Sequence, residues 1–243
     1  DDLWILDAAS PLLGGVVPGG AKLVRVDLRT DRVARVYRFD STVAPRGSYL
    51  NDVRIDTRRG FAYLSESGEG SLVVVDLDSG ASRRVLADHF STKAEDTTFV
   101  VGGARIGAAI HCDGIALDPK RERLYFQALR GHTLYRISAA LLRDFSALDE
   151  VLAARVETVA RTGVADGIEF DRAGNLYLTS LEHDAIRRYT PAGVLETVVV
   201  DPRLQWPDSF SIGEGGAIYV TTSRIHLGPD TAVPCRLFLV EPY

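Results

Sequence analysis

Four oxygen-bearing side chains recur at matched places along this sequence. Each stands five residues before an Asp or a Gly, and the four are Asn51, Asp113, Asp166 and Asp208. Three carboxylates and one amide oxygen suit a hard cation such as Ca²⁺ or Mg²⁺, with water completing the shell. We predict that they converge on one site that can hold such a cation. Without it, mutual repulsion should raise the pKa of at least one carboxyl group, and a proton would be shared.

A structural explanation of the repeat stays open. Asp or Asn before a strand often caps a turn through its own backbone, so repeated residues can reflect repeated geometry. We assign Asp56, Asp118 and Asp171, at the expected strand ends, to that role. For the four earlier positions we favour function, because burying several carboxylates without partners costs free energy.

Three further residues are candidates near the same site. His111 stands two residues before Asp113 and could act as a general base or a ligand, since an imidazole pKa of about 6.5 suits proton transfer. The alternative for His111 is a structural, hydrogen-bonded role. Trp206, just before Asp208, could stack on a cationic or aromatic ligand, or belong to the core, and Tyr49 could act similarly.

Other chemistries lack their motifs. The remaining histidines show no HxH or HxxxH spacing, which argues against a histidine-based zinc site. The sequence contains neither a GxSxG nucleophile elbow nor a phosphate-binding loop. We therefore expect no nucleotide cofactor, and no haem.

The elements that must position these residues form an internal repeat. After each of the four residues, alternating apolar positions predict a strand with one buried face, and Gly-rich or charged turns lead into a second strand. The second strands share a Tyr, at positions 63, 125, 177 and 219. A third strand follows, starting nine residues after the Tyr in three units, and a more polar fourth strand follows in most.

Such tandem units, spaced by roughly 40–60 residues, are typical of β-propeller blades. The alternative is a β-sandwich or two stacked sheets. The N-terminal segment fits a unit without its first strand, with strands at 3–7, 22–28 and 33–39, and the last unit stops after its third strand. We count about five four-stranded antiparallel blades in one domain, residues 1–243. Because only a closed ring leaves no exposed edge, we predict a six-bladed parent with its first blade or N-terminal part missing here.

Two segments interrupt the repeat of strands. Residues 88–110 form a long connection that ends near Asp113, and we predict a lid over one mouth of the channel. Residues 138–154 predict one or two short helices, with Ser138 as an N-cap.

Composition limits the classes of partner. The chain has 243 residues, 46% hydrophobic and 25% charged, with a net charge of −5, which is typical of a globular protein. The absence of a basic stripe argues against nucleic acid. Its apolar runs are strand-sized, far below the roughly 20 residues that span a bilayer.

Cys112 and Cys235 could form a disulfide or remain free thiols. The chain lacks Met, so we expect a fragment or a mature form.

The runs at residues 3–8, 21–39, 48–80 and 113–144 resemble the major royal jelly protein and Yellow family. The resemblance covers nearly the whole chain, and the Arg- and Ala-rich composition indicates a bacterial member. It implies a six-bladed propeller, secreted or periplasmic, whose central channel binds small organic molecules such as biogenic amines or sterols. Some Yellow members are linked to dopachrome conversion.

A more distant resemblance is to the gluconolactonase and senescence-marker-protein lactonases, at Asn51-Asp52 and Asp166-Gly167-Ile168. In that family a divalent metal is held by a first-blade Glu, by Asn from the third and fourth blades and by a fifth-blade Asp. The resemblance places Asn51 at the third-blade position and Asp166 at the fifth. Asp113 stands where those enzymes have Asn.

Our leading hypothesis is a channel that binds a small organic ligand, with a divalent cation at the four repeated positions. The rival is an enzyme: a metal-dependent lactone hydrolase in which Asp166 or another carboxylate activates water, or an isomerase of a quinone-like substrate. A third hypothesis is a protein-interaction scaffold.

Overall fold

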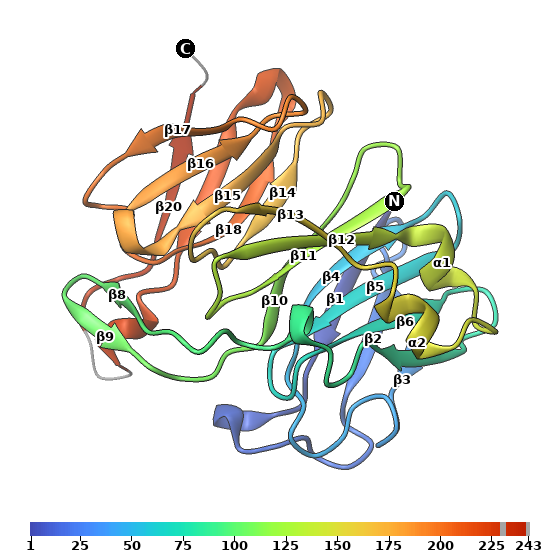
Figure 1. Cartoon of the computed structure of the whole chain (residues 1–243). Coiled ribbons are helices and arrows are strands. Elements are labelled where there is room, and N and C mark those ends of the chain that lie inside the picture. Colours follow the sequence, from blue (N-terminus) through green and yellow to red (C-terminus); the bar gives the residue numbers. More distant parts are fainter. Residues whose placement is uncertain (229–231, 242–243) are drawn as a thin grey trace.

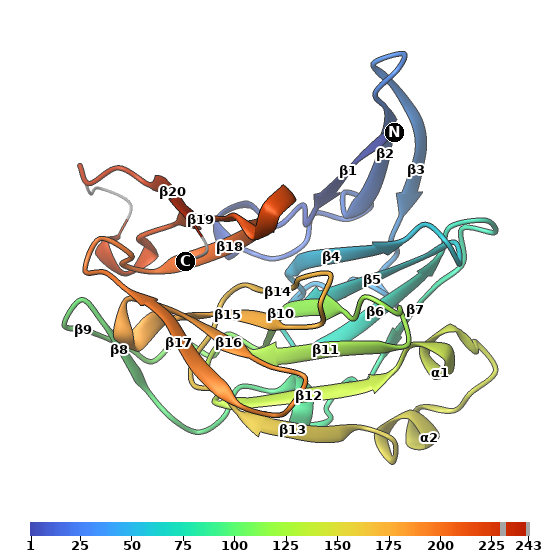
Figure 2. The ribbon, with the colours of Figure 1, turned by 90° about the horizontal axis from the view of Figure 1, so that it is seen from above.

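The computed structural model describes residues 1–228 and 232–241, which form five antiparallel sheets of three or four strands and one two-stranded hairpin. The sheets follow one another around an arc (Figure 1). The inner strands touch in chain order, from β4 to β10, β14 and β18, around a common axis, as Figure 2 shows. The fold is therefore an all-β propeller, as the repeat predicts.

Three complete blades have four strands each. They are β4 (Leu50–Asp56), β5 (Phe61–Glu66), β6 (Ser71–Asp76) and β7 (Ser82–Val85); β10 (Cys112–Leu117), β11 (Arg123–Ala128), β12 (Thr133–Ser138) and β13 (Glu157–Arg161); and β14 (Ile168–Phe170), β15 (Leu176–Ser180), β16 (Ala185–Tyr189) and β17 (Leu195–Val200).

The first and last blades have three strands each. They are β1 (Asp2–Asp7), β2 (Lys22–Asp27) and β3 (Arg32–Arg38), and β18 (Pro207–Ile212), β19 (Ile218–Thr222) and β20 (Arg236–Val240). β1 contacts β4 as β5 contacts β10 and as β15 contacts β18, so β1 takes a second-strand position. The described residues show five blades, which confirms the number counted from the repeat and corrects the six blades predicted for the parent. That number came from ring closure and family resemblance, and no repeat unit of this chain carries it.

The hydrophobic core is divided among the interfaces between neighbouring blades. Tyr63 packs in the cluster between the second and third blades, Tyr125 against the cluster between the third and fourth, and Tyr177 in the cluster between the fourth and fifth. The repeated Tyr is therefore an interface residue. Tyr219 is 41% exposed, because no blade of the described residues packs on its face.

The chain has two insertions, and the β8–β9 hairpin of the first lies on the opposite side of the molecule from the helices of the second (Figure 1). The segment 88–110 contains the 3-10 turn η2 (Phe90–Thr92) and the hairpin of β8 (Phe99–Val101) and β9 (Ala104–Ile106). The segment 138–154 contains two short helices, and the Ser138 side chain caps the first, as predicted. The helices and remaining turns are α1 (Ala139–Arg143), α2 (Asp149–Ala153), η1 (Pro11–Leu13), η3 (Leu181–His183), η4 (Glu214–Gly216) and η5 (Ile225–Leu227).

The two cysteines are free thiols, with Cys112 buried and Cys235 exposed, so the disulfide alternative does not apply. Within the residues that the structure describes, no helix is long and apolar enough to cross a membrane.

Candidate functional site

The inner strands share an irregularity at the repeated oxygen residues. The pairing register shifts between Leu50 and Val53 in β4, between Cys112 and Ile115 in β10, and between Pro207 and Phe210 in β18. Such bulges occur next to functional sites because they change the direction of side chains. Asn51, Asp113 and Asp208 lie inside these bulges, and Asp166 lies just before β14.

The four residues occupy equivalent places in their blades. Each stands two residues before the position where regular pairing with the second strand resumes. The resuming pairs are Val53 with Leu64, Ile115 with Phe126, Ile168 with Leu178, and Phe210 with Val220. The five-residue spacing in the sequence therefore corresponds to one position around the channel.

Two glycines allow the inner strands to approach closely. A Cβ added at Gly114 would lie 2.4 Å from the carbonyl oxygen of Asp166, and one at Gly167 would lie 2.0 Å from that of Asp208. Real Cβ atoms do not approach oxygen so closely, so only Gly fits at these places. The Asp-Gly pairs at 113–114 and 166–167 thus bring the carboxyl groups of adjacent blades together.

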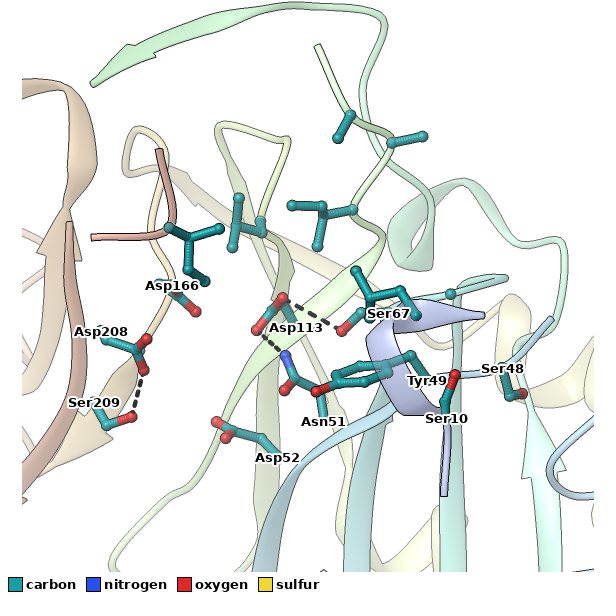
Figure 3. Close-up of a pocket in the computed structure, with 18 of the residues that line it drawn as sticks. Ser10, Ser48, Tyr49, Asn51, Asp52, Ser67, Asp113, Asp166, Asp208 and Ser209 are labelled. Atoms are coloured by element: carbon teal, nitrogen blue, oxygen red, sulfur yellow. Dashed lines mark hydrogen bonds between the residues drawn. The ribbon is translucent and has the colours of Figure 1, made fainter. Parts of the chain in front are cut away.

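These side chains line one cavity of about 590 Å³ at the channel mouth (Figure 3). All predicted ligand-binding and metal-binding residues contribute to its wall: Tyr49, Asn51, Asp113, Asp166, Trp206 and Asp208. Asp52 and Ser67 also line the cavity, although the sequence did not lead us to propose them as site residues. Apolar side chains complete the wall, including Leu13, Ile110, Leu129 and Ile225.

Hydrogen bonds fix the carboxyl groups that lie deepest. Asn51 donates from Nδ2 to Asp113 Oδ1 at 2.6 Å, and the Ser67 hydroxyl donates to Asp113 Oδ2 at 3.3 Å (Figure 3). Trp206 donates from Nε1 to Asp166 Oδ2 at 2.7 Å. Each of the two carboxyl groups is therefore held by a neighbour that was itself predicted as a site residue or lines the cavity.

The electrostatics of this cluster favour neutral carboxyl groups. Burial raises the pKa of Asp113 well above its usual range, and the charges of Asp52 and Asp208 raise it further. Burial and then the neighbouring Asp113 charge raise the pKa of Asp166 in the same way. Burial also raises the pKa of Asp52, against the lowering effect of Arg54. Burial is thus the larger cause, with mutual repulsion adding to it.

Trp206 belongs both to the core and to the site. Its side chain is 1% exposed, packs on Phe99 at 6.0 Å between ring centroids and stacks on His226 at 5.8 Å. Phe99 and Val101 of the β8–β9 hairpin are buried in the same cluster. The insertion 88–110 is therefore docked through its own apolar residues, and residues 108–110 form part of the cavity wall.

His111 lies outside the cavity wall. Its Nδ1 accepts a hydrogen bond from the backbone N–H of Ala94 at 2.9 Å, and its backbone N–H donates to the Ser67 carbonyl at 2.9 Å. Burial lowers the pKa of the imidazole, and the Lys93 charge adds to this. The imidazole thus links the insertion to β10, in agreement with the structural alternative that the sequence left open.

Three second-strand hydroxyls support the irregular inner strands, and sequence reasoning missed them. Ser65 Oγ accepts a hydrogen bond from the backbone N–H of Asp52 at 3.0 Å. In the same way, Thr179 Oγ1 accepts from the backbone N–H of Asp166 at 2.8 Å, and Thr221 Oγ1 from the backbone N–H of Ser209 at 3.2 Å. These bonds satisfy backbone donors that the disturbed ladder leaves unpaired. The signal was present as a Tyr-x-Ser/Thr tripeptide at 63–65, 177–179 and 219–221.

The predicted cation site has oxygen donors of the right type, and rotation of the Asn51 carboxamide would present its oxygen in place of Nδ2. Within residues 1–228 and 232–241, no group of three or more His, Cys, Asp and Glu side chains is arranged so that it could hold a metal ion. As they stand, the carboxyl groups of Asp113 and Asp166 accept protein donors instead.

Comparison with known proteins places the chain among propellers. The model of the family described as Major royal jelly protein matches residues 1–228. No curated protein matches the chain.

Three solved structures illustrate the similarity of fold. A catalytically inactive virginiamycin B lyase from Staphylococcus aureus with quinupristin has a TM-score of 0.59 at 12% identity, covering 90% of this chain and 59% of that one. A gluconolactonase from Xanthomonas campestris has a TM-score of 0.55 at 16% identity, covering 94% and 71%. The calcium-binding protein regucalcin from Agrobacterium tumefaciens has a TM-score of 0.53 at 16% identity, covering 94% and 80%. At these identities the similarity concerns the fold alone.

Proposed function

Because the chain belongs to the major royal jelly protein family, we propose that it binds a small organic ligand with a positive charge in the cavity at the channel mouth. One observation carries this proposal. Four carboxyl groups line the cavity, from Asp52, Asp113, Asp166 and Asp208, and none of the described lining residues is Lys, Arg or His. A positively charged ligand would balance these groups.

The rest of the wall fits the organic part of such a ligand. The rings of Tyr49 and Trp206 can contact a cation or an aromatic group, and Leu13, Ile110 and Leu129 offer apolar surface. A volume of about 590 Å³ is within the range of roughly 300–1,000 Å³ of small-molecule pockets. The ligand would place its charged group at the carboxyl cluster and its apolar part toward the insertion.

Calorimetry with benzylamine tests this proposal, with benzyl alcohol as the neutral counterpart. We expect benzylamine to bind and benzyl alcohol not to bind. Asp208→Asn should weaken benzylamine binding by at least about tenfold, because a hydrogen bond to a charged group contributes about 1.5–3 kcal/mol and each 1.4 kcal/mol is a factor of about ten. The control is Asp31→Asn, which makes the same charge change at an exposed position. Equal binding of the amine and the alcohol would contradict the proposal.

A second candidate is binding of a divalent cation. Its support is the equivalent placement of Asn51, Asp113, Asp166 and Asp208 around one mouth. A bound Ca²⁺ or Mg²⁺ would polarise a carbonyl group such as that of a lactone. The chain itself would hold the Asp166 carboxyl through Trp206 and supply the other oxygen donors.

Calcium titration followed by lactone hydrolysis with and without chelator tests this second candidate. We expect Asn51→Ala and Asp166→Ala to lower both calcium content and turnover, whereas Asp31→Asn should leave both unchanged. If calcium does not bind to the wild-type chain, the lactonase hypothesis loses its support.

Location outside the cytoplasm, secreted or periplasmic, is a proposal that follows from the family and is tested by fractionation of cells that produce the full protein.

A further inference from the structure

A second layer of charge lies next to the cavity, on the channel side of the inner strands. Arg54 of β4 donates from Nη2 to the carbonyl oxygen of Ile168 in β14 at 2.9 Å, and its Nε lies 3.3 Å from a carboxylate oxygen of Glu169. β4 and β14 belong to blades that are separated in the arc by the blade of β10. Arg54 therefore spans the channel from one blade to the next but one.

Arg54 is also connected to the cavity through Asp52. Its Nη2 lies 3.6 Å from Asp52 Oδ2, and the three side chains are partly buried, with 22% of Arg54, 33% of Asp52 and 29% of Glu169 exposed. Asp52 lines the cavity, whereas Arg54 and Glu169 do not. The guanidinium thus pairs with one cavity carboxylate although it does not itself line the cavity.

We infer that Arg54 determines the charge of the ligand that this cavity accepts, making it selective for organic cations with one positive charge over dications. The inference rests on the proposed function, since it concerns the same cavity. Arg54 pairs with Asp52, so this carboxylate is not free to bind the ligand. Burial already favours the neutral forms of Asp113 and Asp166, so few negative charges remain for the ligand. A second positive charge on a ligand would have to compete with Arg54 for the Asp52 carboxylate.

The physical basis is the permanence and proximity of the guanidinium charge. Arg stays protonated at every pH that a protein tolerates, so its effect on Asp52 is constant. The energy of interaction between two unit charges falls as their distance increases and as the local dielectric constant rises. Among the described residues, Asp113, Asp166 and Asp208 form no ion pair with a cationic side chain, whereas Asp52 pairs with Arg54. Only Asp52 therefore has its charge offset by the protein.

A purely structural role for Arg54 makes a different prediction. As a brace between β4 and β14, its removal would lower stability and weaken all ligands to the same extent. As a determinant of ligand charge, its removal would change the relative affinities for monocations and dications. The ratio of the two affinities therefore separates the roles.

The test compares benzylamine with para-xylylenediamine, whose ring carries a second aminomethyl group and therefore a second positive charge. The variant Arg54→Met with Glu169→Gln removes the guanidinium and also the carboxylate that it would leave unpaired. The matched control is Glu169→Gln alone. By calorimetry, we expect the diamine-to-monoamine affinity ratio to be about tenfold higher in the double variant than in the control, a difference of about 1.4 kcal/mol.

Two further variants keep the result interpretable if the double variant is unstable. Arg54→Lys retains the charge and should keep the wild-type ratio. Asp52→Asn leaves Arg54 facing an uncharged neighbour and should weaken the diamine more than the monoamine. Circular dichroism establishes that each variant is folded before its affinities are compared.

The outcomes separate this inference from the function on which it rests. Binding of benzylamine with the same ratio in the double variant and its control would overturn the role of Arg54 and leave the proposed function standing. If neither amine binds to the wild-type chain, both fall. A raised ratio in the double variant, together with a wild-type ratio in Arg54→Lys, would support the inference.

Discussion

Asp113 shows how one residue can combine several functions of the site. The residue is 3% exposed, and its carboxyl group accepts hydrogen bonds from Asn51 and Ser67 and lies among other carboxyl groups. Hydrogen bonds stabilise the charged form, but burial outweighs them and keeps the pKa of Asp113 raised. The residue is therefore suited to hold either a proton or a share of a ligand's positive charge.

The raised pKa values of Asp113 and Asp166 predict a pH-dependent stability. A carboxyl group whose pKa is raised on folding binds more protons in the folded state, so its stabilising contribution is present below the unfolded pKa of about 4 and is lost as pH rises through the folded pKa. We expect urea unfolding to show lower stability at pH 8 than at pH 5. Asp113→Asn should reduce this loss because the amide does not ionise. Asp31→Asn, at an exposed turn, should leave this loss of stability unchanged. If Asp113→Asn loses as much stability between pH 5 and pH 8 as the wild type, the explanation is wrong.

At the scale of elements, the bulged inner strands and the Asp-Gly pairs create the site. The bulges contain Asn51, Asp113 and Asp208, and Gly114 and Gly167 let neighbouring strands approach. Gly167→Ala places a Cβ 2.0 Å from the Asp208 carbonyl oxygen, so the strands must separate. We expect a loss of about 1–3 kcal/mol in urea unfolding, as for other overpacked sites, and weaker benzylamine binding.

Gly107→Ala is the matched control for that substitution, because a Cβ added at Gly107 meets nothing within 4 Å. It should leave both stability and benzylamine affinity nearly unchanged. If Gly167→Ala behaves like Gly107→Ala, the close approach of β14 and β18 does not limit the fold, and the role that we give to Gly167 is wrong.

At the scale of the whole molecule, the insertion 88–110 connects the site to the outer part of the propeller. Phe99 is fully buried against Trp206, which in turn holds Asp166. Phe99→Ala should lower the free energy of unfolding by about 3–5 kcal/mol and weaken benzylamine binding, because the cavity that it leaves frees the Trp206 ring. Phe90→Ala, in the same insertion but 66% exposed, should have little effect on affinity. Full affinity in a folded Phe99→Ala protein would show that the insertion does not position Trp206.

The five blades also illustrate the limits of a count made from the repeat. The second-strand Tyr marks four units, and the first unit is identified by its later strands. The sixth blade was expected from closure of the ring, which is a property of the assembled sheets and has no residue pattern of its own within the described chain. The count of five blades, which rests on residue patterns, is therefore confirmed, whereas the described residues do not show the sixth blade.

The sequence by itself determined the strand order, the blade repeat and the equivalence of Asn51, Asp113, Asp166 and Asp208, because strand periodicity and turn chemistry are local. Only the tertiary structure decided which neighbours join them. Asp52 enters the cavity since a bulge interrupts the alternation of side chains in β4, whereas His111 is directed to Ala94 of the insertion. The span of Arg54 from β4 to β14 was equally hidden, because it depends on the distance between blades around the channel and not on spacing along the chain.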